Sequence, residues 1–169
     1  MKNANEGKFE ELFKEQLKDI YWAENHLLKA LPKMKDAAST PTLREAIGDH
    51  MKETENQIKR LEKIFENLGM DKKGKKCEAM EGLLEEADEM LDEFKNVKYV
   101  KDAAIIMAAQ KIEHYEIATY GTLCNMAKIM GNDNVTQLLE ETLKEEKHAD
   151  ELLTKIAVEE VNEEAMQEG

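Results

Sequence analysis

Two carboxylates interrupt the apolar side of a segment that otherwise has the pattern of a core helix. In Gln110–Leu123, Glu113 and Glu116 share a stripe with apolar residues such as Ile117. An unpaired ion on a buried helix face costs on the order of several kcal/mol. A bound metal ion is the strongest partner available to such carboxylates. The spacing therefore predicts that this segment contributes ligands to a metal site.

The other three long apolar-periodic segments carry a carboxylate at a comparable place, namely Glu24, Glu53 and Glu145. His148 follows Glu145 by three residues, so both lie on one helix face and can bind one metal or two adjacent metals. One Glu from each of two helices, plus Glu-x-x-His from each of the other two, is the di-iron carboxylate pattern. Oxygen ligands with imidazole suit iron or manganese, with zinc as a substitute. We therefore expect two metal ions per chain.

The second of these segments departs from the pattern, because Asn56 stands where the second Glu-x-x-His requires histidine. His50 lies one turn before Glu53 and can supply the imidazole instead. Gln57 lies one turn after Glu53 and can act as a weak ligand or as a hydrogen-bond donor.

The last segment leaves two registers open. Glu146 and Asp150 form an i, i+4 pair about 100° further round the helix than Glu145 and His148.

Glu116 can add a bridging ligand one turn after Glu113. The alternative for each isolated Glu is a place on the solvent-exposed helix face. The candidate metal ligands are Glu24, His50, Glu53, Glu113, Glu116, Glu145, Glu146 and His148.

Helices must position these residues, because apolar side chains recur at spacings of three and four in each segment. The pattern predicts helices over about 8–37, 41–68, 77–95, 102–130 and 135–161, with a kink at Pro32 and glycine stops at Gly69 and Gly131. Four are long, and the helix over 77–95 suits a crossover. We predict an all-α, ferritin-like four-helix bundle: two antiparallel hairpins joined by a long crossover containing the additional helix.

The 169 residues predict a single domain, with flexible tails at 1–7 and about 162–169. The net charge of −13 argues against nucleic acid and anionic membranes as partners. No apolar run approaches the roughly 20 residues of a membrane span. Cys77 and Cys124 lie far apart without a CxxC motif, so we expect free thiols and a cytoplasmic location.

The chain resembles the YciE/YciF family of ferritin-like bacterial proteins along nearly its whole length. The matching strings are Leu17–Glu24, Leu27–Met34, His50 with Glu53-Thr54 and Gln57, Arg60–Glu62, Cys77–Leu83, Ala109-Gln110, Ile112–Ala118, Tyr120–Leu123, and Thr142–Glu146 with Asp150. The family pattern keeps Glu145, Glu146 and Asp150, whereas His148 is not part of it. In the helix that carries Glu145 and His148, the chain therefore looks more like rubrerythrin than other members of the family do.

The resemblance implies a rubrerythrin-like bundle, a homodimer and a link to bacterial stress responses, with two metals between the long helices. Two functions follow as hypotheses. The first is a di-iron or di-manganese oxidoreductase of ferroxidase or peroxidase type that reacts Fe(II) with hydrogen peroxide or oxygen. The second is a non-catalytic helical stress protein that acts through dimerisation or partner binding.

Overall fold

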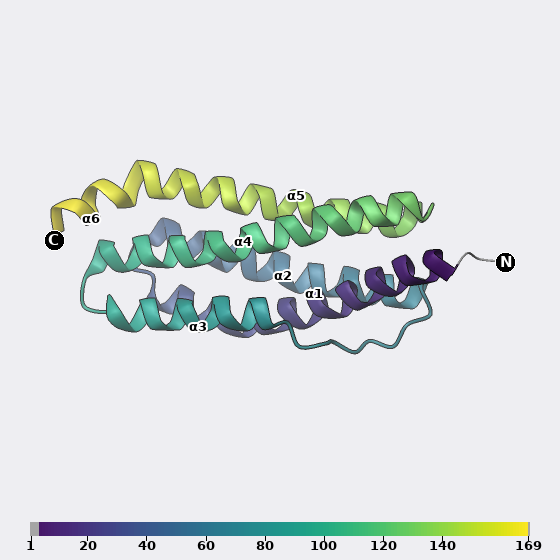
Figure 1. Cartoon of the computed structure of the whole chain (residues 1–169). Coiled ribbons are helices and arrows are strands. Elements are labelled where there is room, and N and C mark those ends of the chain that lie inside the picture. Colours follow the sequence, from purple (N-terminus) through teal and green to yellow (C-terminus); the bar gives the residue numbers. More distant parts are fainter. Residues whose placement is uncertain (1–3, 169) are drawn as a thin grey trace.

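Four long helices lie side by side along the molecule (Figure 1). The computed structural model describes residues 4–168, and this range contains helices and no strand. The long helices are α1 (Ala4–Ala37), α2 (Pro41–Asn67), α4 (Lys98–Ile129) and α5 (Asp133–Ile156). Within each hairpin α1 packs on α2 and α4 on α5, while α1–α4 and α2–α5 contacts join the hairpins. The all-helical prediction is confirmed.

The crossover between the hairpins contains α3 (Glu78–Glu93), inside the segment 77–95 where the sequence predicted a helix. This helix packs against α1 and α4. The loop before it runs along α1, where the Lys75 backbone N–H donates to the Lys18 carbonyl over 3.0 Å. A side chain at Gly74 would place its Cβ 3.2 Å from the Trp22 Cα, a tight contact that glycine avoids.

Helix α1 runs without interruption through Pro32, where the sequence predicted a kink and a restart. Pro32 is exposed, whereas Leu31 and Met34 on either side of it are buried in the core. Packing of these neighbours holds the helix together, although proline removes one backbone donor.

The C-terminal segment is helical and contacts the start of α4. After α5 the chain continues through a π-helical turn, η1 (Ala157–Val161), into α6 (Asn162–Glu168). The Glu168 carboxylate accepts hydrogen bonds from the backbone N–H groups of Lys98 and Tyr99. Residues 4–7 and 162–168, within the tails that the sequence predicted to be flexible, are helical. Residues 1–3 and 169 of those tails lie outside the described range.

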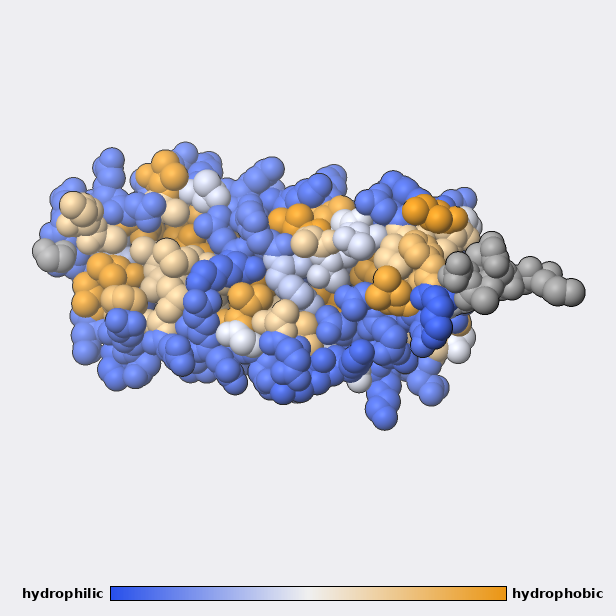
Figure 2. All heavy atoms as spheres, viewed as in Figure 1, coloured by the Kyte–Doolittle hydropathy of each residue, from blue (hydrophilic) through white to orange (hydrophobic). Residues whose placement is uncertain are grey.

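The core runs the length of the bundle and includes Phe13, Leu17, Ile20, Leu43, Leu61, Phe65, Ile105 and Leu139. Hydrophilic residues cover most of the face in Figure 2, with separate hydrophobic patches between them. Cys77 and Cys124 are free and buried, as expected. Within residues 4–168, no helix has the length and apolar character that crossing a membrane requires.

A buried aspartate ties the two hairpins together at one end of the bundle. Asp102 of α4 accepts hydrogen bonds from the backbone N–H groups of Ser39 and Thr40, both over 2.7 Å. Thr40 is the residue before α2, but its own side chain makes no capping bond. The carboxylate of Asp102 thus fixes the turn from α1 to α2.

Asp102→Ala should lower the free energy of unfolding by roughly 1.5–3 kcal/mol, the range for hydrogen bonds to a charged group. Asp88→Ala is the matched control, because the Lys33–Asp88 ion pair is more than half exposed on both sides. We expect its effect to stay within about 0.5 kcal/mol. Urea unfolding of both variants measures this. Equal effects would contradict the role given to Asp102.

Candidate metal centre

Helix α4 supplies two carboxylates to the middle of the bundle. Glu113 and Glu116 are one turn apart on the buried side of α4, 2% and 0% exposed. Ile112 and Tyr120 on the same helix are also buried, so the helix cannot turn these carboxylates to solvent without exposing apolar side chains. The sequence prediction that both lie on a core stripe is confirmed.

His50 from α2 and Glu146 from α5 meet the two carboxylates of α4. One ligand atom from each of these four buried residues lies within 4.8 Å of all the others. The His50 Nε2 atom is 3.2 Å from Glu113 Oε1. Three helices distant in sequence thus bring three carboxylates and one imidazole to one point, which we call the acidic cluster (His50, Glu113, Glu116 and Glu146).

Glu24 of α1 adjoins the acidic cluster and is fully buried. The Tyr120 hydroxyl donates a hydrogen bond to Glu24 Oε1 over 2.5 Å. Burial raises the pKa of Glu24 well above its usual value, and the charge of Glu146 raises it further. All four long helices therefore contribute to one buried polar site, with Glu24 inward as predicted.

The structure places Glu146 inward and Glu145 beside it. Arg60 of α2 donates to both oxygens of Glu145, over 2.7 and 2.6 Å. Gln57 Nε2 donates to Glu146 Oε1 and, over 3.1 Å, to Glu145 Oε2. His148 is exposed. Of the two registers left open by the sequence, the one with Glu146 thus faces the cluster, and the Glu145–His148 pair does not.

Two other candidates lie around the acidic cluster. Glu53 is at its rim, with a side chain 34% exposed and Oε2 3.5 Å from His50 Nδ1. Asp150 accepts from Gln110 Nε2 over 3.0 Å and lies 3.2 Å from His114 Nε2. Neither residue is among the four that converge. Glu53 lies where it can orient His50, whereas Asp150 contacts Gln110 and His114 outside the cluster.

Sequence reasoning missed Arg60. Its charge is opposite to that of Glu145, but the two residues are on helices of different hairpins. Apart from the family string Arg60–Glu62, the available signal was the charge itself, because the register between α2 and α5 cannot be read from spacing along either helix. Gln57 was weighed as a ligand or donor, and the structure shows it as a donor.

Many polar atoms of the site lack a hydrogen-bond partner. They include Oε2 of Glu24, Oε2 of Glu113, both oxygens of Glu116 and Oε2 of Glu146. The ring nitrogens of His50 make no hydrogen bond and have only the close carboxylate contacts with Glu53 and Glu113. Buried polar atoms in folded proteins are almost always satisfied. Carboxylate oxygens and imidazole nitrogens are the ligand atoms that iron and manganese bind. The residues present therefore fit a metal centre, and a cation would satisfy these atoms together.

The pKa shifts of the site residues also favour a bound cation. Burial raises the pKa of Glu24, Glu113 and Glu116 well above the usual 4.5, and repulsion between neighbouring carboxylates raises it further. Burial alone lowers the pKa of His50, but Glu53 and Glu146 outweigh it, so the net change is upward. Without a metal the site retains protons. Divalent cations would displace them, because ligands bind metal in the deprotonated form.

A family model described as "Domain of unknown function (DUF892)" matches residues 8–166, almost the whole chain. The chain belongs to this family. The protein YciF of Escherichia coli strain K12 is 45% identical over 157 residues, which cover 92% of this chain and 94% of that protein. The resemblance to the YciE/YciF family is thereby confirmed.

Solved structures of relatives share the fold of this DUF892 chain. The crystal structure of the Escherichia coli stress protein YciF has a TM-score of 0.86 at 44% identity, covering 96% of this chain and 99% of that one. YcfI from Rhodopseudomonas palustris, described as a candidate structural protein, has a TM-score of 0.82 at 43% identity. The match covers 86% of this chain and 92% of the YcfI chain.

Glu116→Gln should stabilise the metal-free protein at alkaline pH. A carboxyl with a raised pKa binds more protons in the folded than in the unfolded state, so the free energy of unfolding falls as pH rises above about 4.5. The uncharged amide removes this penalty. We expect a gain of roughly 1–3 kcal/mol at pH 8 in EDTA and little gain near pH 4.

Denaturant unfolding at both pH values measures this effect. Glu145→Gln serves as the control, because it weakens a bidentate contact with Arg60 and should destabilise the protein at pH 8. A Glu116→Gln protein less stable than wild type at pH 8 without metal would contradict the electrostatic account.

Proposed function

We propose that this chain is a ferritin-like di-metal carboxylate protein, with two iron ions bound among α1, α2, α4 and α5. One observation carries the proposal: four buried ligand residues from three helices converge within 4.8 Å, and most of their polar atoms have no partner. Manganese and zinc suit the same donors. The side-by-side helices with a helical crossover fit the ferritin-like four-helix bundle.

Five residues would hold the metals: Glu24, His50, Glu113, Glu116 and Glu146. Both oxygens of Glu116 lack a hydrogen-bond partner, so this carboxylate would be able to bind metal through either one. Bound Fe(II) would supply the electrons that reduce peroxide or oxygen. The protein holds its carboxylates in place for this: the Tyr120 hydroxyl binds Glu24 Oε1, and Gln57 binds Glu146 Oε1.

The relatives support a role in stress protection, since the Escherichia coli relative is described as a stress protein. Removal of Fe(II) and of the oxidant in one reaction would serve that role. A homodimer and a cytoplasmic location stay predictions from the family resemblance.

A second candidate function is a non-catalytic helical protein that acts through dimerisation or partner binding. The description of the Rhodopseudomonas palustris relative as a candidate structural protein favours it. In this case the raised pKa values of Glu24, Glu113 and Glu116 would keep the buried carboxyls protonated, and they would hydrogen-bond to one another without metal.

Anaerobic titration with Fe(II) separates the two functions. The proposed function predicts about two Fe(II) per chain, because this donor arrangement holds two ions. Glu146→Ala should remove at least one site. Its matched control is the adjacent Glu145→Ala, which loses the contact with Arg60 but none of the five residues proposed to hold the metals. The control should keep both sites and lose about 10–100-fold in affinity at most, as expected for a supporting residue.

Equal binding by the two variants would contradict the assignment of Glu146. Absence of metal binding by wild-type protein, with no change of melting temperature between EDTA and Fe(II), would leave the structural function in place.

Reactivity is a separate prediction. The Fe(II)-loaded protein should oxidise its iron faster than free Fe(II) does when oxygen or hydrogen peroxide is added, because buried carboxylates stabilise the higher charge of Fe(III). Stopped-flow absorbance of Fe(III) formation measures this, with Glu116→Gln as the impaired variant. Metal binding without faster oxidation would restrict the protein to metal binding.

A further inference from the structure

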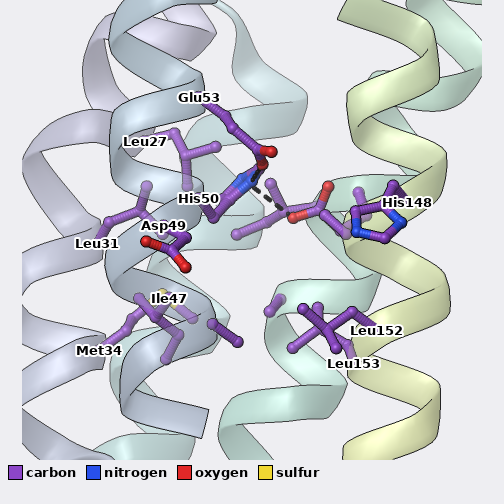
Figure 3. Close-up of a pocket in the computed structure, with 15 residues that line it drawn as sticks. Leu27, Leu31, Met34, Ile47, Asp49, His50, Glu53, His148, Leu152 and Leu153 are labelled. Carbon is purple, nitrogen blue, oxygen red and sulfur yellow. Dashed lines mark ion pairs between the residues drawn. The ribbon is translucent and has the colours of Figure 1, made fainter. Parts of the chain in front are cut away.

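A cavity of about 160 Å³ adjoins the acidic cluster on one side. Figure 3 shows Leu27, Leu31 and Met34 on one side of it and Leu152 and Leu153 on the other, with His50 and Glu53 near one end. Glu113 also lines it. The cavity therefore has an apolar body and a polar end formed by two residues of the acidic cluster.

Three alanines open this space. Ala46 of α2, Ala109 of α4 and Ala149 of α5 line the cavity, where longer apolar side chains would fill it. Protein interiors pack to the density of organic crystals, so a void of this size is unfavourable unless something occupies it. Voids of about 150 Å³ lined by Leu, Ile and Phe hold one benzene molecule. The size therefore suits a single small organic molecule.

Charge restricts the occupant further. The lining includes the carboxyl groups of Asp49, Glu53 and Glu113, and it includes no lysine or arginine. These three carboxyl groups would repel a carboxylate or phosphate ligand, and the basic side chains of the lining are the imidazoles of His50 and His148 alone. The apolar body disfavours a hydrated cation. An uncharged, mainly apolar molecule remains.

The cavity also has a route to solvent. Asp49 and His148 line it, come from α2 and α5, and are both exposed. On the other side of the acidic cluster, Gln57 and Arg60 bridge the same two helices through Glu145 and Glu146. The seam between α2 and α5 is thus closed on one side and accessible on the other.

We propose that this cavity binds one small uncharged apolar organic molecule, of about the size of benzene, against the His50–Glu113 side of the metal centre. The position of the ligand beside bound metal rests on the proposed function. Binding in the cavity itself does not, because the apolar body and the alanines form it without metal.

Fluorobenzene is a suitable probe, because ¹⁹F NMR detects its binding to the full-length protein with or without metal. In EDTA, wild-type protein should bind it saturably at one molecule per chain, and benzene should compete. With Mn(II) bound, the ¹⁹F relaxation rate of the bound probe should rise strongly over that with Zn(II). Titration of the same samples with each metal establishes loading independently.

Ala46→Leu and Ala149→Leu each fill the cavity and should abolish saturable fluorobenzene binding while metal loading remains. Two variants guard against one that fails to fold. Ala118→Leu is the matched control on the exposed side of α4 and should change neither property. This pattern, together with the Mn(II) effect, supports the proposal.

Other results overturn it. No saturable binding by wild-type protein, or equal binding by both filled variants, would exclude the cavity as the site. Equal relaxation with Mn(II) and Zn(II) in samples shown to be loaded would separate the ligand from the metals. Binding of xenon under pressure without fluorobenzene would indicate a passage for dioxygen instead. Failure of metal loading alone would reject the proposed function, and the EDTA experiment would still decide the cavity.

Discussion

Buried negative charge without a buried positive side chain is the constraint on which the rest of this structure depends. Glu24, Glu113, Glu116 and Glu146 all lie inside the bundle, and His50 is the basic group among them. Arg60 lies nearby, but its guanidinium binds Glu141 and Glu145 instead. Protons or metal cations must therefore neutralise the cluster. Loading of the site and stability of the fold are coupled for this reason.

The contacts around the cluster hold carboxylates in position without neutralising them. A neutral hydroxyl, from Tyr120, binds Glu24, and a neutral amide, from Gln57, binds Glu146. A lysine or arginine at either place would form an ion pair and compete with a metal. Arg60 lies next to the acidic cluster, where its guanidinium binds Glu145. Glu146 therefore stays available to the cluster.

Spacing along a single helix predicted which residues share one face of that helix. It left open which residues of different helices meet. Glu113 and Glu116 follow from one apolar stripe. On α2, however, the buried stripe runs through His50, Thr54 and Gln57, so Thr54 takes the inward place expected for Glu53. On α5, Glu145 and Glu146 both fit between buried Thr142 and Ala149. Contact with Arg60 decides between them, and a contact between hairpins leaves no periodic signal in either helix.

The same division applies to the fold and to the space beside the centre. The helices and the crossover follow from apolar periodicity, whereas the anchor at Asp102 and the contact of Glu168 with the start of α4 join distant segments. The cavity likewise arises from three helices together: Ala46, Ala109 and Ala149 each read as ordinary small residues on their own helix. Their convergence on the side opposite Gln57 and Arg60 gives the centre one closed and one accessible side. Small residues at this seam therefore leave one side of the centre accessible, where larger apolar side chains would pack it closed.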